Sequence, residues 1–322
     1  MDVLCLGELL IDMIGEDTGS LKDMQSFRKY AGGAAGNVAV GVSKLGLKSS
    51  FLGRLSTDGF GDFLVQTMED YGVCSDLITR DSEHKTTIAF VSLNEKKVPS
   101  YLFYRDASAS SFYCPEDLRE SAFRGAKALY FSSLSLAKRP IRDANYTAVK
   151  YAEENNLIVA FDPNIRLSVW QSPDAAKQEI FNMFPHTDIL KLNDDEIRFL
   201  FGSDSLPELC RRIFEEYSKM QLIAITLGPD GTFLMDKRGE YCHVPAVDLP
   251  VIDTCGAGDT FMSAVLAFWI RNQGVSGEKA LKQLGLYANA AAYITASRNG
   301  VIPSMPYQNE VEELLQKLGC DK

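Results

Sequence analysis

An aspartate directly after a Gly-Ala-Gly turn is the residue in this sequence best suited to acid–base chemistry. The stretch VIDTCGAGDTF, residues 251–261, puts Asp259 after Gly256, Ala257 and Gly258, at the start of a strongly apolar run. Small residues let consecutive backbone N–H groups converge, and the positive end of the following helix adds to them, which suits a phosphate or a developing oxyanion. Phosphoryl transfer to an alcohol needs such an anion site and a carboxylate that accepts the hydroxyl proton. The alternative role for Asp259 is that of an ordinary helix N-cap.

A second glycine-rich stretch, YAGGAAGNVAVGVSKLG over residues 30–46, is another candidate ligand site. Gly32 and Gly33 allow a ligand to approach the backbone closely, and Asn37 opens a helix that apolar residues continue. One alternative is a tight turn before a helix, and another is the dinucleotide-binding loop of a dehydrogenase. The spacing does not match G-x-G-x-x-G, and the preceding SFRKYA is a poor strand, so the pattern disfavours the dehydrogenase.

The two stretches resemble the two signature motifs of the ribokinase-like (PfkB) carbohydrate kinases, among which the fructokinases are most similar. The first motif corresponds to residues 31–61 and the second to DTCGAGDTFMSAVL, residues 253–266. Their order, their separation and the flanking strands agree as well, and the resemblance runs from about residue 3 to about residue 308. It implies an ATP-dependent sugar kinase in which Asp259 is the general base and the amides of Gly256, Ala257 and Gly258 stabilise the transferring group.

The resemblance also implies residues that bind the sugar and Mg²⁺. Asp12, at the end of the first strand, would bind sugar hydroxyls together with Gly32, Gly33 and Asn37, although a turn-forming Asp is common at a strand end. In KLNDDE, residues 191–196, Asn193 and Glu196 would help to hold Mg²⁺, partly through water. The i,i+3 spacing of that pair is equally typical of a capped helix start.

A third set of implied residues would hold the nucleotide and a monovalent cation such as K⁺. TLGPDG, residues 226–231, resembles the nucleotide-binding strand and turn of the family, although its glycines on their own indicate only a turn. The nucleotide residues implied in this way are Thr226, Gly228, Gly231 and Asn289. The monovalent-cation residues are Asp253, Gly300 and Ser304.

Two arginine-containing segments bear on the identity of the sugar. DPNIRLSVW, residues 162–170, and FYRDASAS, residues 103–110, resemble fructokinase segments, so Arg166 and Arg105 would bind fructose or the transferred phosphate. The related 2-keto-3-deoxygluconate kinases would use these arginines for a substrate carboxylate. An exposed, solvated arginine is the alternative at both positions. A non-catalytic sugar sensor on a kinase scaffold would be expected to lose the base or the anion site, and this chain has both.

Strand and helix patterns alternate along the chain in the manner of an α/β protein. Short apolar strand candidates occupy residues 2–11, 48–55, 126–133, 156–162, 188–193 and 222–228, and helical periodicity occupies 61–72, 143–156, 261–274 and 278–296. This alternation predicts a mostly parallel sheet with ligands at the carboxyl ends of its strands. The resemblance makes it one ribokinase-like, three-layer domain over residues 1–322.

Two segments interrupt the alternation. Residues 13–31 lack helical periodicity, and TTIAFVSLNEKKVPSYLFYR, residues 86–105, is typical of two strands around a charged turn at Asn94 to Lys97. We expect these segments, about 13–31 and 86–106, to form a small β-sheet lid. Family members often dimerise through such strands, which makes a homodimer an expectation here.

The composition limits the partners and the compartment. The 322 residues carry a net charge of −10, which disfavours a nucleic acid or an anionic membrane as the main partner. The seven cysteines form no C-x-x-C pair, and the three histidines lack metal-ligand spacing, so neither a disulfide framework nor a zinc site is indicated. The N-terminal stretch has no basic region before its apolar run, and we expect a cytoplasmic protein.

Overall fold

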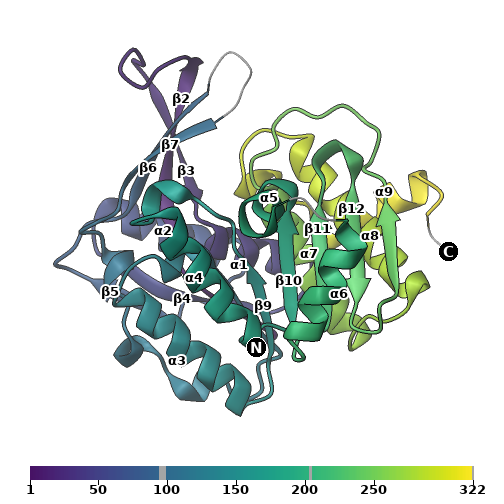
Figure 1. Ribbon diagram of the computed structural model, residues 1–322. Coiled ribbons are helices and arrows are strands. Elements are labelled where there is room, and N and C mark those ends of the chain that lie inside the picture. The colour runs from purple at the N-terminus through teal and green to yellow at the C-terminus, as the bar shows by residue number, and fades with distance from the viewer. Residues whose placement is uncertain (94–98, 203–204, 321–322) are drawn as a thin grey trace.

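The computed structural model describes residues 1–93, 99–202 and 205–320, and within them the strands form two separate sheets (Figure 1). The large sheet has nine strands and the small one has four within the same described ranges. The charged turn predicted at Asn94 to Lys97 lies outside the described residues.

The large sheet is mostly parallel, as predicted. Its strands pair in parallel except that β12 runs antiparallel to both of its neighbours. The central strands are buried on both faces, which explains their continuous apolar runs. In sheet order the strands are β13 (Tyr241–Val244), β12 (Thr232–Asp236), β11 (Leu222–Thr226), β10 (Ile189–Asn193), β9 (Ile158–Asp162), β8 (Ala128–Ser132), β1 (Val3–Leu6), β4 (Ser49–Ser56) and β5 (Ile78–Asp81).

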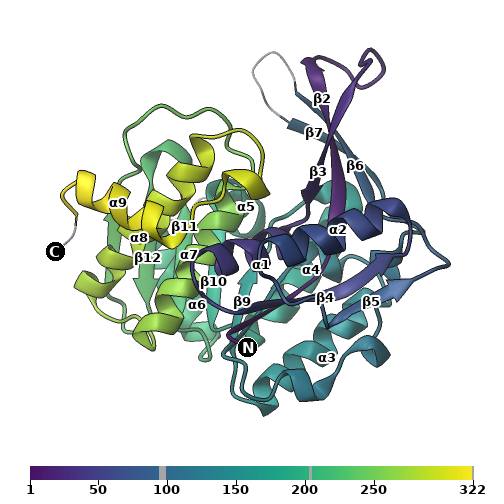
Figure 2. The ribbon, with the colours of Figure 1, turned by 180° about the vertical axis from the view of Figure 1, so that it is seen from behind.

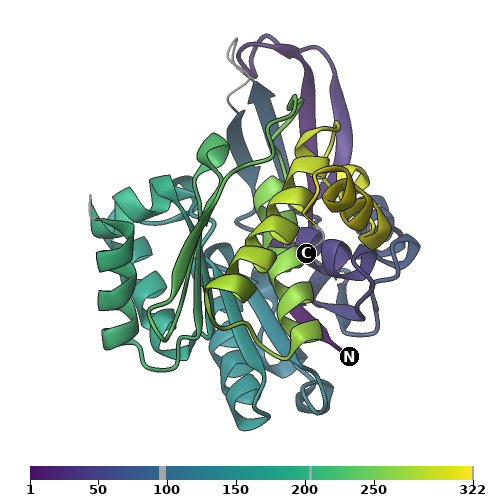
Figure 3. The same ribbon diagram turned by 90° about the vertical axis from the view of Figure 1, so that its right-hand side faces the viewer.

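Helices cover both faces of this sheet and make the three-layer fold that the sequence predicts (Figure 3). Each face has its own apolar core. One core is packed by α1 (Ala34–Lys44), α2 (Gly59–Asp70), α7 (Ala257–Asn272), α8 (Glu278–Ala296) and α9 (Gln308–Lys317). The other is packed by α3 (Ile141–Glu154), α4 (Pro173–Met183), α5 (Asp194–Phe201) and α6 (Leu206–Glu216). Among the described helices, none is long and apolar enough to cross a membrane.

The small sheet projects from the large one beside the carboxyl ends of its strands (Figures 1 and 2). Its order is β3 (Phe27–Gly32), β2 (Leu10–Thr18), β6 (Ile88–Leu93) and β7 (Pro99–Tyr104). The two interrupting segments therefore do form strands of a separate sheet, which begins at Leu10 rather than at residue 13.

Two strand predictions were wrong in detail. The apolar run over residues 2–11 is not one strand but β1 and the start of β2, so Asp12 lies inside β2 and not at the end of the first strand. The run is apolar throughout because both sheets bury it, and its hydrophobicity alone shows no break. The segment SFRKYA, expected to be a poor strand, contributes most of β3, because β2 supplies the pairing partner that its own pattern does not reveal. Since β3 belongs to the small antiparallel hairpin, the glycines after it are still not a dinucleotide-binding loop.

Candidate active site

Asp259 lies in the first turn of α7 but does not cap it. The N-cap is Gly256, and Asp259 is the third helical residue. Its carboxylate accepts a hydrogen bond from Asn37 Nδ2 at 2.8 Å and a longer one from Asn164 Nδ2 at 3.5 Å. Neither donor belongs to α7, so the N-cap hypothesis for Asp259 is wrong.

Burial changes the acidity of Asp259. The residue is 8% exposed, and this burial raises the pKa of its carboxyl to about 6, against the lowering effect of the Asn37 hydrogen bond. A carboxyl with a pKa close to neutrality can both take up and release a proton near physiological pH. Asp259 therefore has the acidity and the fixed orientation that a general base requires.

The turn before Asp259 offers unpaired backbone donors. Gly256 has φ 77°, and a Cβ there would lie 2.5 Å from Val301 Cγ1, so only glycine fits. In the described structure the amides of Gly256 and Gly258 have no hydrogen-bond partner, whereas the amide of Ala257 donates to Thr254 O at 3.2 Å. Two of the three expected donors are thus available to an anion at the positive end of α7.

A second carboxylate, Asp12, reaches the same place from β2. A Cβ on Gly32 of the neighbouring strand β3, which pairs with Leu10, would overlap the Asp12 carboxylate, so this glycine makes room for the side chain. Gly33 is the N-cap of α1 with φ 104°, and a Cβ there would overlap the backbone of Glu8. Burial raises the pKa of Asp12 to about 7, the charge of Asp259 adds to the rise, and Arg166 opposes it.

The two candidate arginines have different environments. Arg105 is buried at 5% exposure, forms an ion pair with Glu8, and donates to Leu134 O at 3.2 Å, so the solvated-surface alternative is wrong for it. Arg166 is half-buried, and its guanidinium carbon lies 5.5 Å from the centre of the Tyr101 ring. The charges of Arg166, Asp12 and Asp259 all act on the Tyr101 hydroxyl. We call the residues that meet here the carboxylate cluster: Asp12, Asn37, Tyr101, Arg166 and Asp259.

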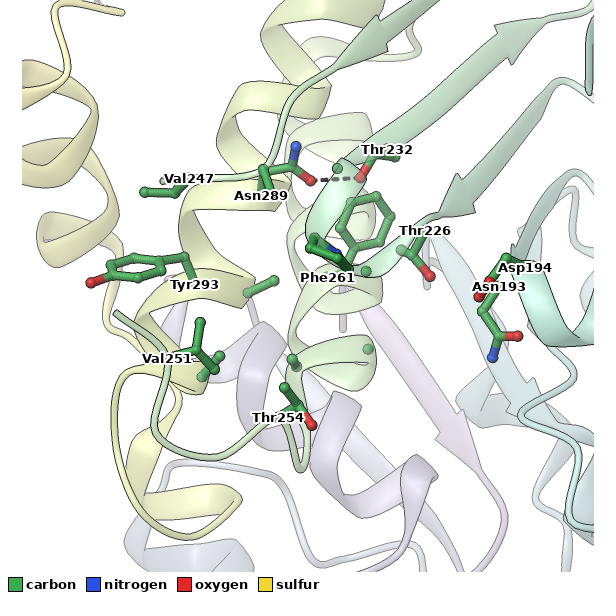
Figure 4. A pocket seen from close by; sticks show the side chains of 18 of the residues that line it. Asn193, Asp194, Thr226, Thr232, Val247, Val251, Thr254, Phe261, Asn289 and Tyr293 are labelled. Carbon is green, nitrogen blue, oxygen red and sulfur yellow. Dashed lines mark hydrogen bonds between the residues drawn. The ribbon is translucent and has the colours of Figure 1, made fainter. Parts of the chain in front are cut away.

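A cavity of about 550 Å³ adjoins this cluster at the N-terminal end of α7 (Figure 4). All four residues expected at a nucleotide line it, and so do Ala257 and Gly258 of the anion turn. Much of the remaining wall is apolar. The residues that line the cavity include Asn193, Thr226, Gly228, Gly231, Thr232, Val247, Val251, Ala257, Gly258, Phe261, Asn289 and Tyr293.

Asn289 shapes the cavity with its polar atoms already paired. Thr232 Oγ1 donates to Asn289 Oδ1 at 2.6 Å, the bond drawn in Figure 4. Asn289 Nδ2 in turn donates to the carbonyls of Val244 and Pro245 at 3.1 and 3.0 Å. Asn289 therefore joins α8 to β12 and to the chain at the end of β13. It forms part of the cavity wall, and its side-chain amide is already hydrogen-bonded within the protein.

The Asn193 and Glu196 pair forms the capping box that its spacing allows. Asn193 Oδ1 accepts from the Glu196 amide at 2.8 Å, and Glu196 Oε2 accepts from the Asn193 amide at 2.9 Å. Glu196 Oε1 also accepts from the Ile165 amide at 2.8 Å. In the part of the chain that the structure describes, no three His, Cys, Asp or Glu side chains gather as a metal site. Asn193 lines the cavity, and its side-chain oxygen together with the Glu196 carboxylate still fits Mg²⁺, which keeps several water ligands and binds phosphate oxygens.

The three residues implied for a monovalent cation lie in the loops beside α7 and α8. Asp253 Oδ1 accepts from the Cys255 amide at 3.0 Å, and Ser304 Oγ donates to Val301 O at 2.7 Å. The carbonyl of Ser304 also accepts from Arg298 at 3.5 Å. Gly300 lies against Tyr30 of β3, and a Cβ added to Gly300 would be 3.5 Å from the Tyr30 ring. No hydrogen bond of the described residues joins these three to one another.

Sequence reasoning missed three residues of the site: Tyr101, Asn164 and Lys191. Asn164 belongs to the DPNIR segment already noted, and its left-handed φ of 43° is a conformation that Asn tolerates. Lys191 was detectable as a lysine in the middle of a strand with apolar neighbours. Tyr101 had no comparable signal, because its position depends on how the small sheet lies against the core.

Comparison with known proteins covers nearly the whole chain. The model of the pfkB family carbohydrate kinases matches residues 1–308. A relative named probable fructokinase-6, chloroplastic, from Arabidopsis thaliana is 35% identical over 98% of this chain and 82% of its own length. An uncharacterized sugar kinase from Pyrococcus horikoshii in complex with ATP has a TM-score of 0.84 at 32% identity, with coverage of 98% and 97%. A double-mutant fructokinase from Vibrio cholerae, bound to fructose, ADP and potassium, has a TM-score of 0.87 at 27% identity and 98% coverage of both chains.

Proposed function

The chain belongs to the pfkB family of carbohydrate kinases, and from that premise we propose that it transfers the γ-phosphoryl group of ATP to a hydroxyl of fructose. One observation carries the proposal: the buried Asp259 carboxylate, held by Asn37, lies between a second carboxylate and the unpaired amides beside the cavity. A base, a sugar-binding acid and an anion site within one small region are what phosphoryl transfer to an alcohol requires.

Different residues of the chain have different roles in the proposed reaction. Asp259 takes the proton of the sugar hydroxyl while that oxygen forms its bond to the γ-phosphorus. The bond from the γ-phosphorus to the bridging oxygen breaks, and its electron pair leaves with ADP. The amides of Gly256 and Gly258 stabilise the charge on the transferring group. When bound near Asn193 and Glu196, Mg²⁺ would supply positive charge to the phosphates.

Fructose is favoured over 2-keto-3-deoxygluconate by the charges of the carboxylate cluster. The charge of Arg105 is balanced by Glu8, and the charge of Arg166 acts on both Asp12 and Asp259. A substrate carboxylate would bring a third negative charge to this place, whereas the hydroxyls of a neutral ketohexose can donate to Asp12. The relatives named fructokinases support the same choice.

A panel of sugars tests this proposal. The purified protein with Mg-ATP is compared by kcat/KM on fructose, tagatose, ribose, 2-keto-3-deoxygluconate and adenosine, with ADP release as the signal. We expect the highest kcat/KM with fructose. A ribose value equal to that of fructose would contradict the sugar assignment, and no ADP release above the sugar-free rate would favour the non-catalytic sensor.

The nucleotide is proposed to bind in the cavity with its phosphates toward α7. The cavity volume of about 550 Å³ suits a ligand of that size, and Ala257 and Gly258 line the end nearest Asp259. Potassium is proposed near Asp253, Gly300 and Ser304. A rate that rises with K⁺ but not with Na⁺ at constant ionic strength would support it, and equal rates would contradict it.

A homodimer through the small sheet is also proposed, with a second copy of the chain on its outer face. Phe27, Phe90 and Tyr104 form a row of aromatic rings there, and Tyr104 and Leu102 are 62% and 48% exposed. Exposed apolar area of this kind is typical of a protein–protein contact. Light scattering should give the dimer mass, and Leu102→Glu should give the monomer mass.

A cytoplasmic location is proposed because the cysteines of the described structure are all free, which suits a reducing compartment. The name of the Arabidopsis relative includes a chloroplast location, so the proposal needs its own test. Cell fractionation with an antibody to the chain should find it with cytoplasmic markers rather than with organelles.

A further inference from the structure

Lys191 is a buried lysine in the centre of the large sheet. It is the third residue of β10, and it is 4% exposed. Leu190 and Leu192 point into the core beside α3–α6, whereas Ile189 packs in the core on the α7 side. Because side chains alternate along a strand, Lys191 points toward α7. Burying an ammonium group is costly unless it has a partner, so this position needs an explanation.

Asp162 is the partner of Lys191. The distance from Lys191 Nζ to Asp162 Oδ2 is 2.8 Å, and the Asp162 side chain is fully buried. Burial lowers the pKa of Lys191, but the carboxylates of Asp162 and Glu196 outweigh this, and the net shift is upward. The ammonium is therefore charged. Among the described residues, Asp162 is the one hydrogen-bond acceptor of Nζ, although an ammonium has three hydrogens to donate.

The ammonium lies against the anion turn. A Cβ added to Gly258 would be 3.3 Å from Lys191 Nζ. Gly258 lines the cavity, and so does Asn193, two residues after Lys191 on the same strand face (Figure 4). The charged end of Lys191 therefore lies next to Gly258, whose amide has no hydrogen-bond partner among the described residues and which lines the cavity directly before Asp259.

We propose that Lys191 is a catalytic residue that donates a hydrogen bond to the phosphoryl group while it is transferred. The proposal rests on the proposed kinase function. Lys191 keeps all its protons: the hydroxyl proton goes to Asp259, the new bond joins the sugar oxygen to phosphorus, and ADP leaves with the electron pair of the broken bond. The contribution of Lys191 is a fixed positive charge beside Gly258, where negative charge gathers on the phosphoryl oxygens.

The competing explanation is that Lys191 only neutralises Asp162. A buried pair of that kind can be replaced by two neutral residues with little loss of stability, whereas removing one partner alone is costly. The double variant Lys191→Met with Asp162→Asn therefore separates the two roles, because it restores charge balance without restoring the ammonium.

The matched control is a second lysine–aspartate pair at the opposite end of the same strand. Lys219 Nζ lies 2.5 Å from Asp188 Oδ2, and Asp188 directly precedes β10. Lys219→Met with Asp188→Asn removes a less buried pair of the same types, at the end of the strand away from the anion turn. It should leave kcat within about twofold of the wild type.

The experiment compares kcat, melting temperature and nucleotide binding of the two double variants with the wild type. We expect the Lys191 double variant to melt within a few degrees of the wild type and to lose about 100- to 1,000-fold in kcat, as for other single donors to a developing oxyanion. Its affinity for the β,γ-imido analogue of ATP should fall about tenfold or more, with the affinity for ADP unchanged.

Recovery of kcat to within about threefold of the wild type, or an unchanged preference for the analogue over ADP, would overturn the proposal. The binding comparison needs no sugar. If the wild-type protein phosphorylates no sugar, the proposed function fails, and analogue binding still decides the role of Lys191.

Discussion

The carboxylate cluster and the cavity lie side by side, yet their polar groups are in opposite states. In the cavity wall, both polar side-chain atoms of Asn289 have protein partners, and Asn193 Oδ1 accepts from the Glu196 amide. In the cluster, burial raises the pKa values of Asp12 and Asp259, and Asn37 Oδ1 is buried with no partner among the described residues. The hydrogen bonds of the cavity wall are therefore made within the protein, whereas the cluster needs a ligand to complete its hydrogen bonds.

This difference implies that the two regions respond differently to substitution. Polar residues of the cluster should act directly on the reaction or on the sugar, and their loss should cost large factors with little effect on folding. Polar residues of the cavity wall should act through the fold, and their loss should cost small factors in nucleotide affinity together with some stability.

Asp259→Asn is the strongest test of the cluster. General-base catalysis is worth about 100- to 10,000-fold in rate, so kcat should fall by that factor. ATP affinity and the melting temperature should stay near the wild-type values, since the amide that replaces the carboxylate has nearly the same shape and its oxygen still accepts from Asn37. A variant with wild-type kcat would show that the carboxylate is not the base.

Asp12→Asn should have the next largest effect. Hydrogen bonds to a charged group are worth about 1.5–3 kcal/mol each, so kcat/KM for fructose should fall about 100-fold. The Kd for ATP should not change, because Asp12 comes from β2 and does not line the cavity. Isothermal titration with ATP and with fructose separates the two, and a loss of ATP affinity equal to the loss of sugar affinity would remove the distinction between the regions.

Lowering the pH should reduce activity by less than the Asp12 and Asp259 substitutions do. Asp259 and Asp12 are needed as carboxylates, and burial raises their pKa values to about 6 and about 7. Activity should therefore be complete only above about pH 8, be halved near pH 7 as Asp12 becomes protonated, and fall further below pH 6 as Asp259 does, by roughly tenfold per pH unit for each protonated group. In Asp259→Asn, loss of the nearby negative charge should lower the pH at which fructose binding declines. A wild-type limb near pH 4 would contradict both assignments.

Asn289→Ala should have the smallest effect, because its role is in the wall. It leaves the Thr232 hydroxyl and the carbonyls of Val244 and Pro245 without their partner. We expect a melting temperature lower by a few degrees, a KM for ATP raised a few-fold, and a kcat within about twofold of the wild type. Thermal denaturation and steady-state kinetics measure these, and a kcat loss of 100-fold would place Asn289 with the cluster instead.

The fold and the anion turn were predictable because their signals are local. Consecutive small residues before Asp259, and the alternation of apolar strands with helices, can be recognised within short windows of the sequence. The ion pair of Glu8 with Arg105 joins residues far apart in the chain, and the contact of Arg166 with Tyr101 joins the core to the small sheet. No local pattern encodes such contacts, so the partner of Arg105 could not be predicted from the sequence, and its role at the substrate stays a prediction.

Two errors have the same physical origin. Residues 2–11 contain apolar residues for two sheets in succession, and SFRKYA becomes a strand only because β2 lies beside it. Both depend on the small sheet, whose strands come from separate parts of the first third of the chain. A pattern read along one segment cannot show which other segment will pair with it.

The Glu8–Arg105 ion pair has a mechanical consequence. Glu8 lies just before β2, and Arg105 directly follows the last residue of β7, so the ion pair joins the inner ends of these two strands, and the bond from Arg105 to Leu134 O fastens them to the core. β2 extends outward over nine residues, an arm of about 30 Å. On such an arm, rotation about the fastened end moves the outer tip far and the inner residues little. Asp12 lies near the fastened end, so a rotation of the small sheet would displace its outer tip while Asp12 keeps its position in the carboxylate cluster.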